Sequence, residues 1–167
     1  TDRVTSALGV SALCSRYVAT GASTVALNPQ AASCSSYGVA GARVNPAGVP
    51  GDSTGFSVVP QLKEMSSAKA FGATELLLVD GGGNDAADLI GAYLGAGADG
   101  GAAYVALLSE LLTPAQVGAA VAGGSTGLAV AGGQYMVALG NALANAIDTH
   151  ALGNGAQRVV LVNAPNV

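Results

Sequence analysis

The sequence predicts an α/β fold built on a parallel sheet. Two short apolar runs, LLLV at Leu76–Val79 and RVVLVN at Arg158–Asn163, lie close to glycine or proline residues, as buried strands of parallel sheets commonly do. A third short strand is predicted at Tyr37–Val44. Helical patterns separate these runs, so the order is strand, helix, strand, helices, strand. This βαβαβ order predicts a parallel sheet with right-handed crossovers.

The length and composition fit a single α/β domain over residues 1–167. A chain of 167 residues, half of them hydrophobic, can bury a sizeable core. Its 25 glycines and low aromatic content predict thin, closely packed helices. The net charge is −4 and the six basic residues are scattered, which argues against a nucleic-acid-binding surface.

Three helices are predicted in the first two thirds of the chain. Ser57 is placed to cap a helix that runs to about Ala70, with Pro60 tolerated in its first turn. Ala86–Leu94 follows the second strand and is predicted to be helical. Val4 and Leu8 mark the end of a helix near the start of the chain. A further apolar stripe consists of Tyr104, Leu107, Leu108, Leu111 and Leu112.

The last third of the chain is predicted to be mainly helical. Thr113-Pro114-Ala115-Gln116 is a strong helix start, because it combines a threonine N-cap, proline at the first position and glutamine at the third. Gly127–His150 is predicted to be one long helix with its larger apolar residues on one side. Its small residues raise the possibility of a membrane span, but Gln134 and Asp148 interrupt the apolar character.

The two cysteines, Cys14 and Cys34, lie in a polar, turn-rich segment. This segment, Val10–Ser36, is predicted to be a long connection with few periodic apolar residues. A disulfide between the two cysteines would stabilise the fold by about 3 kcal/mol through loop entropy and would indicate an exported protein. The alternative is a pair of free thiols in a cytosolic protein. Neither cysteine has the spacing of metal ligands, so no metal site is predicted.

The stretch ELLLVDGGGND, Glu75–Asp85, is the place where a functional site is expected. Its apolar run stops at Asp80 and three glycines, and glycine allows a sharp turn and a close approach to a ligand. Open α/β sheets bind their ligands at the carboxyl ends of parallel strands. Asn84 therefore lies where a site should be.

Two blocks resemble the SGNH (GDSL-type) serine esterases and lipases. Gly82-Gly83-Asn84-Asp85 is similar to their Gly-x-Asn-Asp block, and YGVAGARV at Tyr37–Val44 is similar to an earlier block written Asn-Tyr-Ala-Val-Gly-Gly-Ala. The match places the functional glycine at Gly41, while Ser36 stands where asparagine is common and Ala40 where glycine is common. The resemblance implies a three-layer α/β/α fold with a flavodoxin-like parallel sheet.

The resemblance covers only the central portion of such a domain. The family's first block, Gly-Asp-Ser-Leu, carries the nucleophilic serine, and a late Asp-x-x-His block carries the base. Because the chain lacks both in their expected places, we expect it to be a fragment of a larger SGNH hydrolase domain and to need the rest of that domain as its partner. Such a protein would be exported to the periplasm, the cell surface or the medium, and would act on small-molecule or lipid esters without a cofactor.

The resemblance assigns Gly41 and Asn84 to an oxyanion hole. Hydrolysis of an ester by a serine develops negative charge on the carbonyl oxygen, and fixed donors at that oxygen lower the barrier. The backbone N–H of Gly41, the side chain of Asn84 and the N–H of the serine would supply these donors. An asparagine amide donates without carrying a charge.

Two other stretches imitate the missing blocks. Gly51-Asp52-Ser53-Thr54 is similar to Gly-Asp-Ser-Leu, which makes Ser53 a candidate nucleophile, but a loop precedes it instead of a buried strand, so we favour an acidic turn. Asp148-Thr149-His150 has one residue too few between its aspartate and histidine. Residues two apart on a helix point to different faces, so His150 is predicted to be a surface residue.

Two alternative functions stay open. The chain could be a non-catalytic SGNH-fold module, kept for binding or as a passenger domain. It could also be a nucleotide-binding α/β domain whose glycine turns hold phosphate. Neither glycine turn fits Gly-x-Gly-x-x-Gly, however, and no phosphate-binding P-loop lysine is present.

Overall fold

The computed structural model describes residues 2–11, 13–21, 24–45 and 55–162. Within them the chain is a mixed α/β protein in which helix dominates. The element order is α1 (Asp2–Ala7), β1 (Tyr17–Gly21), β2 (Thr24–Leu27), η1 (Pro29–Ala31), α2 (Val58–Ala68), β3 (Leu77–Asp80), α3 (Gly83–Asp99), α4 (Ala102–Leu111), α5 (Pro114–Ala122), α6 (Gly124–His150), η2 (Leu152–Asn154) and β4 (Val159–Val162).

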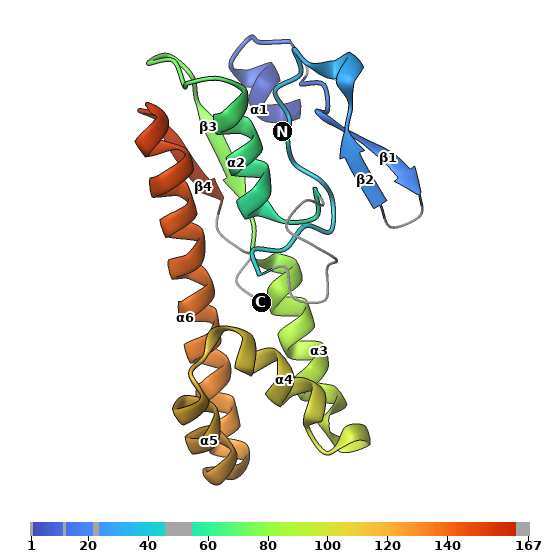
Figure 1. Ribbon diagram of the computed structural model, residues 1–167, viewed down its shortest axis with the longest axis vertical. Coiled ribbons are helices and arrows are strands. Elements are labelled where there is room, and N and C mark those ends of the chain that lie inside the picture. The colour runs from blue at the N-terminus through green and yellow to red at the C-terminus, as the bar shows by residue number, and fades with distance from the viewer. Residues whose placement is uncertain (1, 12, 22–23, 46–54, 163–167) are drawn as a thin grey trace.

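Helix α6 runs along the length of the molecule (Figure 1). Its side chains take part in both hydrophobic cores. The first core packs α2 and β3 against the C-terminal half of α6, through Leu139, Leu143 and Ala146. The second packs α3, α4 and α5 against the N-terminal half of α6, through Ala131 and Tyr135. The predicted apolar stripes face these cores, and α6 begins three residues earlier than the sequence predicted.

The parallel orientation that the sequence predicts for the sheet is confirmed for β3 and β4, which pair with each other. Leu77 pairs with Val159, and the register continues to Asp80 and Val162. Leu77 and Val79 of β3 are buried, but Val160, Leu161 and Val162 of β4 are 46–51% exposed. The prediction that both strands are buried is therefore wrong for β4, where Val159 alone of the described residues packs against the first core.

The prediction of a third strand at Tyr37–Val44 is wrong. This segment forms a turn and one isolated parallel bridge, between Arg43 and Ser57, instead of a strand. The N–H of Arg43 donates to Phe56 and the N–H of Val58 donates to the carbonyl of Arg43. Within the segment the N–H of Ala42 donates to the carbonyl of Val39. The N–H of Val44 and the carbonyl of Ala42 bond side chains at the start of α3, as described below.

The segment Val10–Ser36 contains an antiparallel hairpin, β1–β2, which the sequence did not predict. The predicted disulfide is confirmed: Cys14 and Cys34 are bonded, with 5.0 Å between their Cα atoms. The bond closes the base of the hairpin, where the N–H of Arg16 donates to Ser36 and the N–H of Ser36 donates to Cys14. Tyr17 and Tyr37 also pack edge to face beside it.

The helix starts differ in how well the sequence predicted them. The capping box of α5 is confirmed, with the N–H of Gln116 donating to the Thr113 hydroxyl and the N–H of Thr113 donating to the Gln116 side chain. Ser57 precedes α2, as predicted, but its side chain makes no capping hydrogen bond. Helix α3 extends beyond the predicted range at both ends. Within the described ranges, none of the helices combines the length and apolar character that a bilayer span requires.

Candidate functional site

The candidate site lies where β3 runs into α3. Gly82 joins the two elements with a φ of 97°, a left-handed conformation that glycine adopts without strain. Asn84 is the second residue of α3, and its side-chain N–H donates to the backbone carbonyl of Ala42 at 2.9 Å. This bond places the 41–45 segment, hereafter the docking loop, against the N-terminal end of α3.

Asp85 holds the docking loop by its backbone. Its carboxylate is 2% exposed and accepts one hydrogen bond from the N–H of Val44, at 2.9 Å, and one from the N–H of Asn45, at 2.8 Å. A buried carboxylate needs such donors, because an unpaired buried charge is costly. Two loop amides that have no partner in a strand thereby gain a hydrogen-bond acceptor. The loop can therefore hold its conformation although it is not part of a sheet.

An ion pair fixes the start of the docking loop. Two nitrogens of the Arg43 guanidinium bond the carboxylate of Asp88, one of them at 2.9 Å, and another donates to the carbonyl of Gly41 at 3.1 Å. The hydrogen bond to Asp88 raises the pKa of Arg43. Gly41 itself is exposed and has a φ of 85°, so its turn favours glycine.

The loop is also fixed from the opposite side. The side-chain N–H₂ of Asn45 donates to Glu110 of α4 at 2.8 Å and to the hydroxyl of Tyr135 on α6 at 3.1 Å. Tyr135 is almost fully buried, and this burial raises its pKa. The docking loop therefore bridges both hydrophobic cores.

The two residues that the family resemblance singled out lie on either side of one hydrogen bond. Asn84 bonds the carbonyl of Ala42, the residue that follows Gly41. An asparagine amide carries two N–H groups, and the described part of the chain uses one of them. Asn84 lies in the first turn of α3, at the positive end of the helix dipole.

Of the other sequence candidates, the structure describes His150 and Asp148. Ser53 is outside the described residues. His150 is half-buried in the last turn of α6. Gly82 lies close to Leu139, and eleven further residues of helix carry His150 about 16 Å along α6 from that point. Asp148 is exposed, and no group of three potential metal-ligating side chains occurs among the described residues.

Sequence reasoning missed Arg43, Asn45 and the roles of Asp85 and Asp88. Part of the signal was present, because Asp85 and Asp88 are three residues apart and so lie on one face of a helix. Their partners could not be read from the sequence. Arg43 and Asp88 are 45 residues apart in the chain and meet only in the folded protein.

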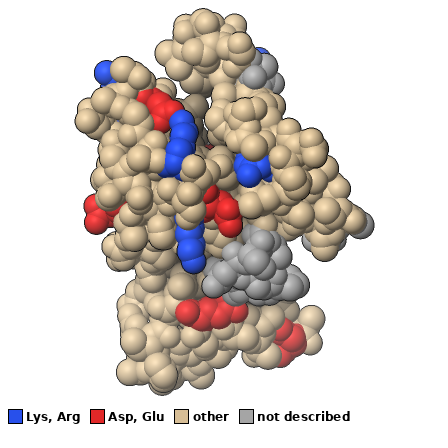
Figure 2. Space-filling model, turned by 45° about the horizontal axis from the view of Figure 1, so that its top comes forward, with Lys and Arg blue, Asp and Glu red and all other residues tan. Residues whose placement is uncertain are grey.

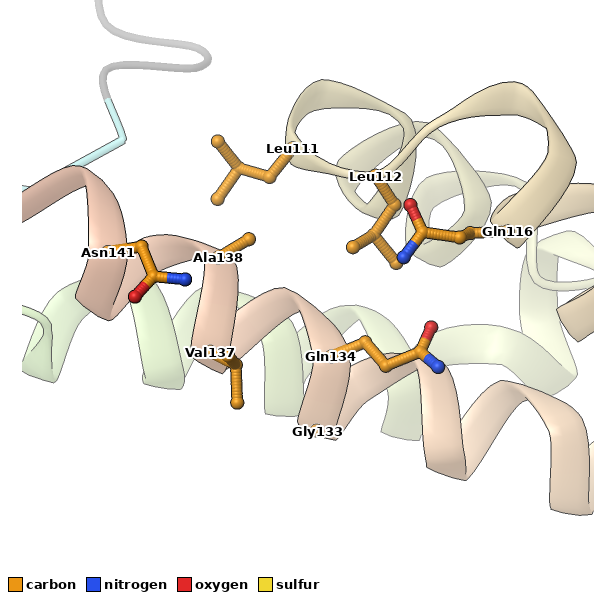
Figure 3. A pocket seen from close by; sticks show the side chains of 8 residues that line it. All are labelled: Leu111, Leu112, Gln116, Gly133, Gln134, Val137, Ala138 and Asn141. Atoms are coloured by element: carbon orange, nitrogen blue, oxygen red, sulfur yellow. The ribbon is translucent and has the colours of Figure 1, made fainter.

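Two hollows lie along α6, and the inner one adjoins the docking loop. The inner one, of about 280 Å³, is lined by Val44 and Asn45 of the loop and by residues of α2, α4 and α6. The outer one, of about 600 Å³, lies between α6 and the α4–α5 corner; Figure 3 shows Leu111, Leu112 and Gln116 on one wall and Gln134, Ala138 and Asn141 on the other. On the face drawn in Figure 2, basic and acidic side chains lie side by side and most of the surface is uncharged.

Comparisons with protein-family models, with curated proteins and with solved structures find no match to this chain. Its function must therefore be inferred from its own residues and their geometry.

Proposed function

We propose that this chain is the central portion of an SGNH-type carboxylic ester hydrolase, in which Gly41 and Asn84 supply donors of the oxyanion hole. The observation that carries the proposal is the bond from Asn84 to the carbonyl of Ala42. It uses one N–H of the amide, fixes the side chain beside Gly41 and leaves the second N–H for a ligand. A donor aligned in advance is what a developing oxyanion requires.

In the proposed reaction, a serine from outside these 167 residues attacks the ester carbonyl carbon. A histidine oriented by an aspartate, also from outside them, takes the serine proton and passes it to the departing alcohol. The negative charge that forms on the carbonyl oxygen is stabilised by the N–H groups of Gly41 and Asn84. Water then hydrolyses the acyl-enzyme by the same steps.

The packing around the site supports this role, because catalytic donors need support that keeps them within a fraction of an ångström of their working position. Asp85 holds the amides of Val44 and Asn45, and the Arg43–Asp88 pair holds the carbonyl of Gly41. An ordinary turn after a strand would not require two carboxylates to hold a distant loop in place, as Asp85 and Asp88 do here.

The exposed strand β4 supports the proposal that the chain works with the rest of a three-layer α/β/α domain. Parallel sheets are normally covered on both faces and have long apolar strands inside. The half-exposed Val160, Leu161 and Val162 fit a strand that the remainder of such a domain would cover. The disulfide supports export, because such bonds persist in oxidising compartments.

The proposal is tested by comparing the complete protein with the isolated 167-residue chain. We expect the complete protein to hydrolyse p-nitrophenyl butyrate and to be labelled by a fluorophosphonate, which modifies activated serines. The isolated chain should do neither, because the proposed nucleophile and base are not in it. Turnover by the isolated chain that Ser53→Ala abolishes would assign the nucleophile to Ser53. A folded complete protein that hydrolyses no ester would contradict the proposal.

A further inference from the structure

The two donors of the proposed oxyanion hole lie on separate segments of the chain. Gly41 belongs to the docking loop, and Asn84 belongs to α3. The N–H of Ala42 donates to the carbonyl of Val39 at 3.2 Å, so Gly41 is the third residue of a four-residue turn. Its φ is 85°, and no described residue other than glycine has a positive φ, which identifies a type II turn. The relative position of the two donors therefore depends on the contacts between this turn and α3.

The side chain of Arg43 supplies such a contact. Its guanidinium donates to the carbonyl of Gly41 at 3.1 Å and to both carboxylate oxygens of Asp88, one of them at 2.9 Å. Asp88 lies one helical turn after Asn84 on the same face of α3. The guanidinium thus connects the residue that would supply the backbone donor with the helix that carries the side-chain donor.

Two carboxylates lie near the Asn84 amide, and their charges are compensated differently. Asp85 accepts hydrogen bonds from two N–H groups of the docking loop. Within the described ranges, Arg43 is the one side chain bonded to Asp88. Without Arg43, an uncompensated negative charge would therefore lie one helical turn from the amide. Like charges repel, so this carboxylate would oppose negative charge on a carbonyl oxygen there.

The exposure of the ion pair favours a role other than stability. The side chains of Arg43 and Asp88 are 29% and 40% exposed. Ion pairs at such positions contribute little to the free energy of folding, because water screens the charges and the side chains lose conformational freedom. An effect of the pair on the reaction can therefore be measured in a protein that stays folded.

We propose that Arg43 is a positioning residue of the oxyanion hole, which fixes Gly41 relative to Asn84 and neutralises Asp88. The first role matters because a donor displaced by a fraction of an ångström loses much of its effect on a developing charge. The second role matters because the oxyanion forms about one helical turn from Asp88. The inference rests on the proposed function, since the donors that Arg43 positions are the ones proposed there.

The test measures kcat and KM of the complete protein for p-nitrophenyl butyrate. Arg43→Gln removes both the support and the charge, so we expect kcat to fall about 30-fold with little change in KM. Adding Asp88→Asn removes the uncompensated carboxylate and should restore kcat about tenfold. High salt should raise the kcat of Arg43→Gln, because it screens a partly exposed charge, and should not raise that of the double variant. Arg158→Gln, which removes an exposed arginine next to β4, is the matched control and should change neither constant.

Hydrogen exchange at the docking loop, which needs no turnover, distinguishes this proposal from the proposed function. The amides of Val44 and Asn45 should exchange about tenfold faster in Arg43→Gln than in Arg158→Gln, while the midpoint of urea denaturation stays the same. Faster exchange in a complete protein that hydrolyses no ester would support Arg43 as the residue that fixes the loop and would refute the proposed function.

Several results would overturn the role of Arg43. Ester hydrolysis with a kcat that Arg43→Gln leaves unchanged would do so and would leave the esterase intact. A double variant no faster than Arg43→Gln would do so as well, because a purely structural ion pair loses its function with either partner. Unchanged exchange at Val44 and Asn45 would contradict it, and so would a kcat that falls only together with the urea midpoint, because the pair would then act through stability.

Discussion

Asp85 is the charged side chain on which the geometry of the candidate site depends most. It is buried, it follows Asn84 directly, and its two oxygens hold two consecutive amides of the docking loop. Asn84 bonds the carbonyl of Ala42, two residues before the first of those amides. Two adjacent residues of α3 therefore bond the docking loop in different ways. Asp85 accepts hydrogen bonds from its amides, and Asn84 donates one to its carbonyl.

Replacing Asp85 should therefore destabilise the fold. Asp85→Ala leaves two loop amides without their acceptor, each at a cost of about 1–3 kcal/mol, so we expect the free energy of unfolding to fall by about 3 kcal/mol. Urea denaturation of the chain measures this. Asp148→Ala, at an exposed position of α6, is the control and should change it by less than about 0.5 kcal/mol. A well-ordered Asp85→Ala protein of unchanged stability would show that the docking loop is held by other contacts.

At the scale of residues, the sequence could identify the polar residue that follows a strand. It could not identify the distant residues that contact it. Asn84 could be singled out because glycines and a buried strand precede it. Ser57 was correctly placed before a helix, but its hydroxyl does not cap α2. The backbone there pairs with Arg43 instead, and no local pattern predicts a contact between such separate segments.

Among the elements, α5 tests how far local rules determine a helix. Thr113 and Gln116 satisfy each other's backbone N–H groups. We expect Thr113→Ala to lower the free energy of unfolding by about 1 kcal/mol, because the N-cap acceptor is lost. Thermal unfolding measures the change. Thr149→Ala, at the exposed C-terminal end of α6, is the matched control, and equal stability of the two variants would show that packing alone holds the start of α5.

Helices were more predictable than strands for a physical reason. A helix of many residues repeats its apolar pattern several times, so α2, α4, α5 and α6 could be recognised from the sequence. A strand of four or five residues gives one or two repeats, and its stability comes from a distant partner. The hairpin β1–β2 was missed for this reason. Tyr37–Val44 was taken for a strand, although it makes one isolated bridge and its Val44 amide bonds the carboxylate of Asp85.

At the scale of the whole molecule, α6 and the docking loop hold two cores together. Tyr135 in the second core receives a hydrogen bond from Asn45, while Val44 packs in the first. The parallel order of β3 and β4 and the disulfide could be predicted from the sequence. The exposure of β4 could not, because the apolar pattern of a strand indicates that it can be buried and does not indicate what covers it.

The central claim is that the Asn84 amide stabilises charge in the transition state, and kinetics of Asn84→Ala in the complete protein test it most directly. In the proposed reaction the amide contacts the carbonyl oxygen mainly when that oxygen is negative, so we expect kcat for p-nitrophenyl butyrate to fall about 10²-fold or more with little change in KM. Asn145→Ala, an exposed asparagine of α6, should keep both constants. A folded Asn84→Ala protein with an unchanged kcat would contradict the claim and reduce the GGGND stretch to an ordinary turn.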